Sequence, residues 1–306
     1  MYDILIVGSG PAGMSAAIYA RRAGYRVLLL ESGIPGGQIV NTPEVENYPA
    51  LAPISGWELA QQFTRQVKAL DTETRRGSAT AIENTGTFFT VHTTVGDIPT
   101  RSVILANGVH RRKLHIPGEQ TYLGHGVSFC ATCDGSFFRG RDVAVVGGGN
   151  TALEDALYLS RLCRQVHLVH RRSDFRGQKL LSDRVAAMPN IHLHMENIPL
   201  GISGGHAVDT LIIQNITDNT PSVLSVSGIF VAIGSEAGNR DFSPALALDQ
   251  NGYFLTDEAC RTNLPGIFAA GDTRSKPLRQ IVTAASDGAI AASSAAEWLD
   301  RQRDSH

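Results

Sequence analysis

The feature that most constrains this 306-residue chain is an internal repeat. Residues 7–32 read VGSGPAGMSAAIYARRAGYRVLLLES, and residues 146–171 read VGGGNTALEDALYLSRLCRQVHLVHR. Each segment runs from an apolar strand through a glycine-rich turn and a helical stretch to a second apolar strand, which is the start of a βαβ unit. Because the offset between them is far too long for a solenoid repeat, the sequence predicts two related α/β domains.

The first glycine-rich turn has the pattern G-x-G-x-x-G of a dinucleotide site. It comprises Gly8, Gly10, Pro11, Ala12 and Gly13 around Ser9. Glycines let the backbone approach a pyrophosphate, whose charge the following helix N-terminus favours. Glu31 ends the next strand, where a carboxylate can accept hydrogen bonds from both hydroxyls of an adenosine ribose. We therefore predict a bound dinucleotide here; the alternative is a tight turn with a surface glutamate.

The second turn fits the same pattern with alanine at the last position. Its residues are Gly147, Gly149, Asn150, Thr151 and Ala152. Where the first copy has Glu31, this one has His170, Arg171 and Arg172, with Arg176 close behind. Guanidinium groups bind a phosphate through paired hydrogen bonds, whereas a carboxylate would repel it. This turn is thus predicted to bind NADPH, the alternative being a solvated basic loop. Because a flavin stays bound while a nicotinamide nucleotide exchanges, FAD is expected in the first turn.

Two of the four cysteines, Cys130 and Cys133, form a C-x-x-C pair. A structural zinc ion normally takes four Cys or His ligands, and Cys163 and Cys260 form no second pair, so a metal site is not expected. C-x-x-C thiols readily form and break a disulfide, which makes a redox role the favoured interpretation. Asp134 follows directly and can act as general acid and base for a thiol, or simply cap a turn.

Composition excludes several other classes of protein. With 27 Lys and Arg against 29 Asp and Glu, the chain has no basic excess for nucleic-acid binding. Its apolar runs fall short of a membrane-spanning helix, and the first residues lack the basic region of a signal peptide. The sequence therefore predicts a cytoplasmic protein with no membrane or nucleic-acid partner.

Together these motifs resemble those of the low-molecular-weight thioredoxin reductases, flavoproteins of the pyridine-nucleotide disulfide oxidoreductase class. The resemblance covers nearly the whole chain and is most specific in CATCDG (130–135), GGGNTA (147–152) and HRR (170–172). GSGPAG (8–13), GGQ (36–38), EVENYP (44–49), AAGD (269–272) and an Arg-Gln pair (279–280) also match.

The resemblance implies an α/β fold of two Rossmann-like domains, with the NADPH domain inserted into a discontinuous FAD domain. The FAD domain would comprise residues 1–113 and 242–306, and the NADPH domain residues 114–241. The inserted domain would rotate about hinges near Lys113 and Asp241, and homodimers are usual in the family. The FAD contacts implied are Gly8, Gly10, Pro11, Ala12, Gly13, Glu31, Gly36, Gly37, Gln38, Asn47, Asp272, Arg279 and Gln280.

The implied activity is electron transfer from NADPH through FAD to a Cys130–Cys133 disulfide, and from the dithiol to thioredoxin or a thioredoxin-like protein. Cys133 would lie closest to the flavin, Cys130 would attack the partner's disulfide, and Asp134 would serve the proton transfers. Phe137 and Phe138 are candidates for contact with the protein partner, or for ordinary core packing.

Three departures from the family's pattern concern Asn107 in place of threonine, Ala50 in place of glycine, and residues 234–240, which lack a proline. None of them removes a redox or phosphate-binding residue. The competing functions are a flavin-dependent dithiol oxidase, a ferredoxin-driven reductase and a flavin-binding redox sensor. The first two would not need the arginines at 171, 172 and 176, whose presence therefore favours the NADPH-dependent reductase.

Overall fold

The chain divides into two compact units in a computed structural model that describes residues 1–42, 44–239, 242 and 244–304. Unit 1 comprises Met1–His110 and Glu236–His306, and unit 2 comprises Arg111–Ser235. The chain crosses between the units twice, at β7 (His110–Arg111) and at β16 (Ser235–Glu236), which pair with each other. Of the expected hinge positions, Lys113 lies in unit 2, and Asp241 lies outside the described residues, as does Arg240.

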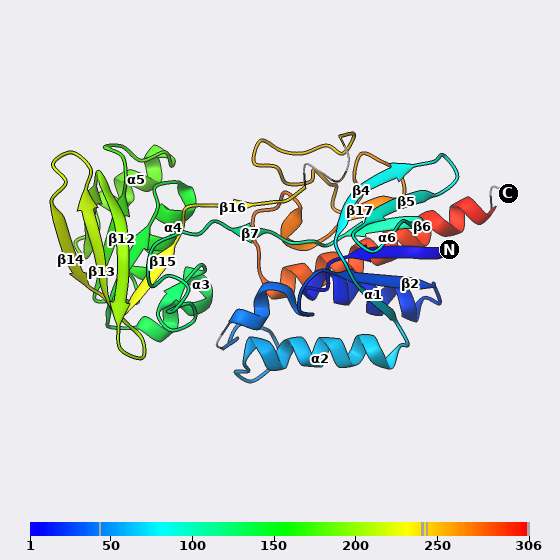
Figure 1. The fold of residues 1–306 in the computed structure, drawn as a ribbon, viewed down its shortest axis with the longest axis horizontal. Coiled ribbons are helices and arrows are strands. Elements are labelled where there is room, and N and C mark those ends of the chain that lie inside the picture. Colours follow the sequence, from blue (N-terminus) through cyan, green and yellow to red (C-terminus); the bar gives the residue numbers. More distant parts are fainter. Residues whose placement is uncertain (43, 240–241, 243, 305–306) are drawn as a thin grey trace. The chain divides into compact units, whose positions relative to one another are not determined.

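Unit 1 is built on a sheet whose strands come from both ends of the sequence (Figure 1). Its strands are β1 (Tyr2–Val7), β2 (Val27–Glu31), β3 (Glu73–Arg76), β4 (Ala79–Asn84), β5 (Phe89–Thr93), β6 (Ile98–Leu105) and β17 (Ile267–Ala269). The order is β3-β2-β1-β6-β5-β4, with β17 also paired to β6. β1, β2, β3, β6 and β17 run parallel, whereas β4 and β5 form an antiparallel extension.

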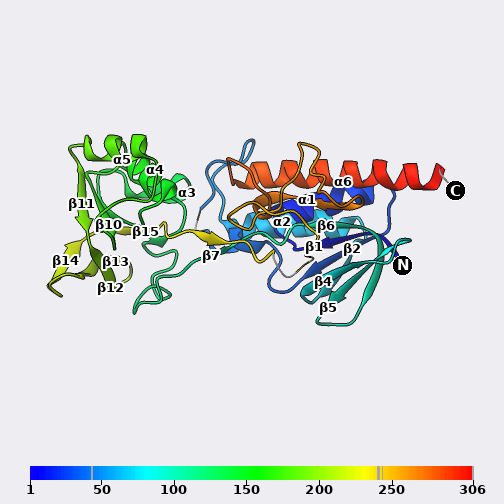
Figure 2. The same ribbon diagram turned by 90° about the horizontal axis from the view of Figure 1, so that it is seen from above.

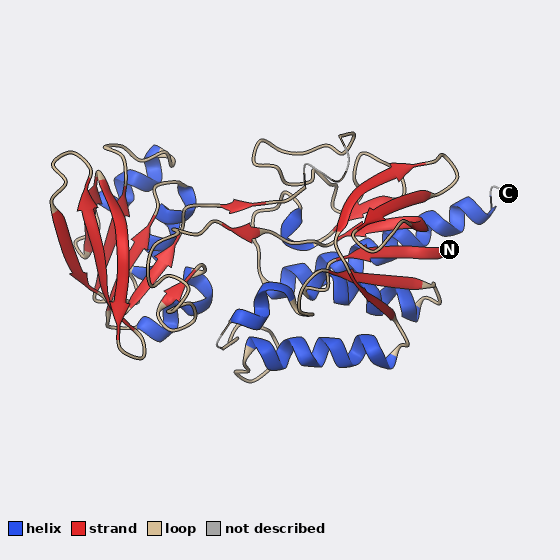
Figure 3. Ribbon diagram, in the orientation of Figure 1, coloured by secondary structure: helices blue, strands red, loops and turns tan. Residues whose placement is uncertain are grey.

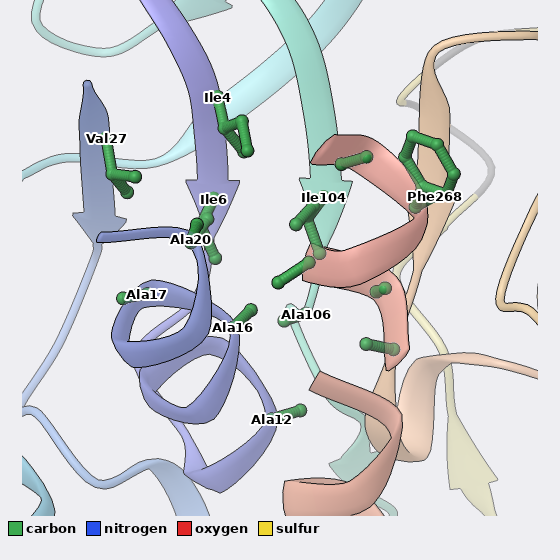
Figure 4. Close-up of a cluster of buried hydrophobic side chains, with 14 of the residues drawn as sticks. Ile4, Ile6, Ala12, Ala16, Ala17, Ala20, Val27, Ile104, Ala106 and Phe268 are labelled. Carbon is green, nitrogen blue, oxygen red and sulfur yellow. The ribbon is translucent and has the colours of Figure 1, made fainter. Parts of the chain in front are cut away.

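The helices of unit 1 cover the sheet. They are α1 (Pro11–Arg22), α2 (Gly56–Ala69) and α6 (Ile281–Asp304), with short 3-10 turns η1 (Gly37–Asn41) and η3 (Gly271–Thr273). Helices α1 and α6 lie side by side on one face of the sheet (Figure 2). The contact is close because small residues line it: a Cβ on Gly288 of α6 would lie 2.0 Å from the Ala12 carbonyl oxygen of α1. Ala12, Ala16 and Ala20 share a buried cluster with Ile6 and Ile104 of the sheet (Figure 4).

Unit 2 has three layers, with helices on one side of a parallel sheet and an antiparallel sheet on the other (Figures 2 and 3). The parallel sheet has the order β11-β10-β9-β15-β8. Its strands are β8 (Val127–Ser128), β9 (Asp142–Val146), β10 (Gln165–His170), β11 (Ile191–Met195) and β15 (Gly228–Val231). The helices are α3 (Ala131–Asp134), α4 (Asn150–Leu159) and α5 (Lys179–Ala186), with a 3-10 turn η2 (Gly135–Phe138). The antiparallel sheet comprises β12 (Asn197–Gly204), β13 (Val208–Asn215) and β14 (Pro221–Ser225).

Strand β9 shows why this sheet must be covered on both faces. Val143 and Val145 belong to the core beneath the helices, whereas Ala144 and Val146 belong to the core beneath the antiparallel sheet. Successive side chains of a strand point to opposite faces, so an apolar strand without alternation requires two layers around it. The predicted α/β class and both strand–turn–helix–strand repeats are thereby confirmed. No helix in the described ranges combines the length and apolarity needed to cross a membrane.

Candidate redox and dinucleotide sites

The C-x-x-C pair is a disulfide at the start of a short helix in unit 2. Cys130 is the N-cap of α3, Cys133 lies within that helix, and their Cα atoms are 5.3 Å apart. One helical turn brings residues i and i+3 to the same side, which is the separation that a disulfide bridge requires. Both cysteines are partly exposed, so the disulfide can be reached from outside the unit.

Asp134 ends the same helix, and its carboxyl group lies in a desolvated position. Burial raises the pKa of Asp134, while a hydrogen bond from Ser128 opposes the rise. The Ser128 hydroxyl donates to Asp134 Oδ2 at 2.6 Å, whereas Oδ1 is buried with no hydrogen-bond partner among the described residues. A carboxyl group with a raised pKa and one unengaged oxygen is suited to accept and return a proton.

The first glycine-rich turn lies at the carboxyl end of β1, where α1 begins with Gly10 as its N-cap. A Cβ on Gly13 would lie 1.8 Å from the Gly8 carbonyl oxygen, so only glycine allows this approach of helix to turn. A Cβ on Gly10, in contrast, would face open space. The turn therefore leaves room for a pyrophosphate beside the N-terminus of a twelve-residue helix.

Glu31 ends β2 beside this turn and is held by donors of Ser9 and Gly33. The Ser9 amide and hydroxyl each donate to Oε2 at 2.7 Å, and the Gly33 amide donates to Oε1 at 2.7 Å. These bonds fix the carboxylate at the strand end. Oε2 already accepts two of them, so the remaining lone pair for a ribose hydroxyl is on Oε1, which accepts one bond from Gly33. The Gly36 amide donates to the Ser9 carbonyl at 2.8 Å, which brings the GGQ segment to the same turn.

The other candidate FAD residues also lie at the carboxyl edge of the unit 1 sheet. The Ala270 amide, just after β17, donates to the Leu105 carbonyl at the end of β6, which places η3 with Asp272 beside that edge. Hydrogen bonds hold the side chains of the remaining candidates. The Gln38 side chain donates to the Val109 carbonyl, and the Asn47 side chain donates to Gln280 Oε1 at 3.1 Å. Arg279 Nε donates to the Asp272 carbonyl at 3.2 Å. Gly37 lies beside Gly10, since a Cβ on it would be 3.2 Å from the Gly10 Cα.

Asn107, the first departure from the family's pattern, joins three segments at this edge. Its side chain donates to Asn239 Oδ1 at 2.9 Å and accepts from Thr273 Oγ1 at 3.0 Å. Asn239 and Thr273 are fully buried, and Thr273 Oγ1 also lies 2.7 Å from Asn239 Oδ1. Asparagine at 107 thus supplies both a donor and an acceptor to a buried network. The second departure, Ala50, has a left-handed φ of 68°.

The second glycine-rich turn repeats this geometry in unit 2. α4 begins with Gly149 as N-cap at the carboxyl end of β9, and a Cβ on Gly149 would meet open space. Asn150 Oδ1 accepts from the Gln178 amide at 2.7 Å, and the Arg176 amide donates to the Gly148 carbonyl at 2.8 Å. The segment after β10 is therefore folded over the start of α4, where Thr151 and Ala152 continue the helix.

Within that segment the arginines and the histidine have different surroundings. Arg171, Arg172 and Arg176 are exposed. His170 is buried, stacks on Phe175 with ring centroids 5.5 Å apart, and has a pKa lowered mainly by burial. A neutral, packed imidazole supports the loop, whereas three exposed guanidinium groups beside a helix N-terminus provide the positive charge that a phosphate monoester requires.

Two groups of residues in these sites escaped sequence reasoning. Ser128 bonds to Asp134 and accepts from the Cys130 amide at 3.0 Å; a serine two residues before an N-cap is the available signal. The second group, here called the Asp287 cluster, consists of Asp287, Arg274 and Lys276 in unit 1. Arg274 lies 3.0 Å and Lys276 2.7 Å from the buried Asp287 carboxylate, which also accepts from the Gly271 amide at 3.0 Å.

The remaining thiols and aromatic candidates lie in core positions. Cys163 and Cys260 are buried, and burial raises the pKa of each thiol to about 11, so both stay protonated at neutral pH. Phe138 packs edge-to-face on Phe230 with centroids 5.4 Å apart, which favours core packing over partner contact for that residue. Phe137 is partly exposed.

Comparison with known proteins gives a consistent result. Residues 2–288 match the family described as pyridine nucleotide-disulphide oxidoreductase. A protein of Listeria innocua named thioredoxin reductase is 40% identical over 99% of this chain and 96% of its own length. One of Treponema pallidum with the same name is 41% identical over 98% and 97%, respectively. The crystal structure of thioredoxin reductase from Streptococcus pyogenes superimposes with a TM-score of 0.94 and 41% identity, covering 98% of this chain and 99% of that one. With its paired dinucleotide turns and its disulfide, the chain belongs to the pyridine nucleotide-disulphide oxidoreductase family.

Proposed function

We propose that this chain is an NADPH-dependent thioredoxin reductase that passes electrons from NADPH through FAD to the Cys130–Cys133 disulfide and on to thioredoxin. The observation that carries the proposal is this disulfide beside a desolvated Asp134, in the same unit as a dinucleotide turn bordered by three arginines. Relatives at about 40% identity over their full length bear that name, which supports the same substrate for this chain.

Unit 1 would hold FAD, and unit 2 would hold NADPH. The open space at Gly10 and at Gly149 fits a pyrophosphate in each turn, and Glu31 fits the ribose of a nucleotide without a 2′-phosphate. Arg171, Arg172 and Arg176 fit a nucleotide that carries one. FAD supplies the two-electron chemistry that accepts a hydride and reduces a disulfide.

The protein's own groups would then manage thiols and protons. In the reduced enzyme the Cys130 thiol gives its proton to Asp134, and the resulting thiolate attacks the disulfide of thioredoxin to form a mixed disulfide. Asp134 returns this proton to the first thiolate that leaves the partner. Cys133 then loses its proton to Asp134 and attacks Cys130 Sγ, which closes the Cys130–Cys133 bond. The second partner thiolate takes that proton, and the partner leaves as a dithiol. Two electrons and two protons have moved to thioredoxin. Phe137, partly exposed beside the disulfide, is proposed to contact the partner.

Location, assembly and motion belong to the same proposal. A cytoplasmic location is favoured because a reducible C-x-x-C pair works in a reducing compartment, and a homodimer because the family usually forms one. Unit 2 is proposed to rotate at the two crossings so that first NADPH and then the disulfide reaches the flavin. Fractionation of cells and analytical ultracentrifugation of the purified protein test the first two points.

Anaerobic reduction of the flavin tests the proposal directly. NADPH is expected to bleach the flavin far faster than NADH, and a bacterial thioredoxin is then expected to be reduced in the coupled insulin assay. Cys130→Ser should abolish reduction of thioredoxin while leaving bleaching by NADPH intact. No bleaching by NADPH would refute the proposal, and closure of a small dithiol by oxygen without NADPH would identify a dithiol oxidase instead. A redox sensor would show no turnover that Cys130→Ser could remove.

A further inference from the structure

The structure assigns Ser128 as the residue that positions Asp134 for proton transfer with the Cys130–Cys133 pair. This inference rests on the proposed function, because it concerns how the proposed proton carrier is held. Ser128 lies at the end of β8, immediately before the segment that carries the cysteines, and its side chain is buried. A strand end within a parallel sheet is a rigid place from which to fix a catalytic group.

The Ser128 hydroxyl acts both as acceptor and as donor of hydrogen bonds, and both bonds go to the segment that carries the two cysteines. Its oxygen accepts the Cys130 amide at 3.0 Å, which fixes the backbone of the N-cap residue. Its hydrogen goes to Asp134 Oδ2 at 2.6 Å; the other acceptor in reach, the Cys130 carbonyl, is 3.4 Å away. Since a hydroxyl has one hydrogen, the shorter and charge-assisted bond takes it.

This arrangement gives the two carboxyl oxygens of Asp134 different tasks. Oδ2 is anchored by Ser128, while Oδ1 is buried with no hydrogen-bond partner among the described residues. Oδ1 is therefore the oxygen left to take the proton of the Cys130 thiol and to return it to the departing thiolate of the partner. Without the anchor the carboxyl group could turn about its χ2 angle, which has a broad minimum, and the two oxygens would become equivalent.

Ser128 also limits the rise in the pKa of Asp134. Burial raises the pKa of this carboxyl group and the Ser128 hydrogen bond lowers it; these are the two influences that the described residues exert. Helix α4 packs against α3, and its titratable groups are Glu154, Asp155 and Tyr158. Burial raises the pKa of Asp155 to about 7, so Asp155 needs a control of its own in any pH profile.

Ser128→Ala tests the inference through the pH dependence of thiol chemistry. Removal of the hydroxyl raises the pKa of Asp134 further, so the base form is lost at higher pH. The acid limb of the rate of thioredoxin reduction is expected to move up by about one pH unit, the usual effect of one hydrogen bond to a charged group. Bleaching of the flavin by NADPH should be unchanged, and Ser128→Thr, which keeps the hydroxyl, should restore the original limb.

Three controls isolate the path through Asp134. In an Asp134→Asn background, Ser128→Ala should change the rate less than about twofold, because coupled residues are not additive. Ser160→Ala removes another buried hydroxyl of unit 2, one that donates to the Leu157 carbonyl, and should leave the limb in place. Asp155→Asn should likewise leave it in place, which excludes Asp155 as its source.

A second readout keeps failure of this inference distinct from failure of the proposed function. The rate at which iodoacetamide alkylates Cys130 in dithiothreitol-reduced protein reports ionisation of the thiol without NADPH or thioredoxin. Its pH profile should shift in Ser128→Ala as the kinetic limb does. If wild-type protein does not reduce thioredoxin, the proposed function is wrong and the alkylation profile still decides about Ser128. An unshifted profile in Ser128→Ala, or loss of flavin bleaching in that variant, overturns the inference.

Discussion

Removal of the Asp287 charge is predicted to destabilise unit 1 by about 3 kcal/mol. Asp287→Asn keeps the shape of the side chain but leaves Arg274 and Lys276, whose side chains are only 13% and 7% exposed, without their carboxylate. Breaking a buried ion pair by neutralising one partner costs roughly 3–5 kcal/mol. The lower end applies because Arg274 keeps bonds to Thr256 Oγ1 at 2.7 Å and to the Asp257 carbonyl at 3.2 Å.

Tryptophan fluorescence measures this loss in the correct unit. The chain has two tryptophans, Trp57 on α2 and Trp298 on α6, and both belong to unit 1. Fluorescence therefore follows the unfolding of unit 1 separately from that of unit 2, which matters because a two-unit chain need not unfold in one step. For a unit of this size, 3 kcal/mol corresponds to a decrease in Tm of roughly 6–12 °C.

Two further variants make the argument refutable. Lys276→Met added to Asp287→Asn removes one unpaired cation and should recover part of the lost stability. If the two side chains contributed independently, the second substitution would not reverse the effect of the first. Glu297→Gln breaks surface ion pairs of the same helix, where Glu297 is 50% exposed, and should change Tm by less than about 2 °C. If Asp287→Asn changes Tm as little as Glu297→Gln, or if Lys276→Met adds a further loss, the cluster does not stabilise unit 1 as argued.

Two other predictions concern unit 2. The double substitution Arg171→Ala and Arg172→Ala should raise the steady-state KM for NADPH by about one to two orders of magnitude, because paired contacts to the phosphate are lost. The KM for NADH should rise much less. Equal effects on the two KM values would contradict a 2′-phosphate site. Burial lowers the pKa of His167, and that of His194 to about 4, so the unfolded chain binds more protons than the folded one below pH 6.5. Thermal unfolding should therefore show stability falling as pH drops from 6.5 towards 4, less steeply in His194→Gln; parallel curves would count against this reasoning.

The strongly patterned parts of the molecule could be predicted from sequence. Both βαβ starts follow from apolar strands that flank glycine-rich turns, and the position of Glu31 at a strand end follows from the same pattern. The antiparallel sheet β12–β13–β14 was not predicted, because strands such as PSVLS are short and half polar and carry no clear periodicity. Sequence pattern identifies repeated local units better than the layers that are packed onto them.

Side-chain partners distant in sequence were harder to predict. His194 is half-buried because β10 runs parallel to β11 and brings His167 Nδ1 within 3.0 Å of His194 Nε2, and no local pattern around His194 indicates this partner. The Asp287 cluster depends on the start of α6, which separates the cations from the carboxylate in sequence. Contacts of this kind arise from strand order and helix packing, and a local sequence motif predicts neither.

The division of unit 1 between the two ends of the chain has a consequence for synthesis on the ribosome. β17 pairs with β6 through Ile267 and Val103, and the Ser15 hydroxyl on α1 donates to the Ala285 carbonyl on α6. At ordinary elongation rates, β6 waits on the order of ten seconds or more for its neighbour to be made. Unit 2 is continuous and can fold during that interval. The end of β6 at residues 103–105, which pairs with β17 and not with β5, is meanwhile open to other strands. We therefore expect the chain to depend most on a chaperone during the interval in which β6 has been made and β17 has not.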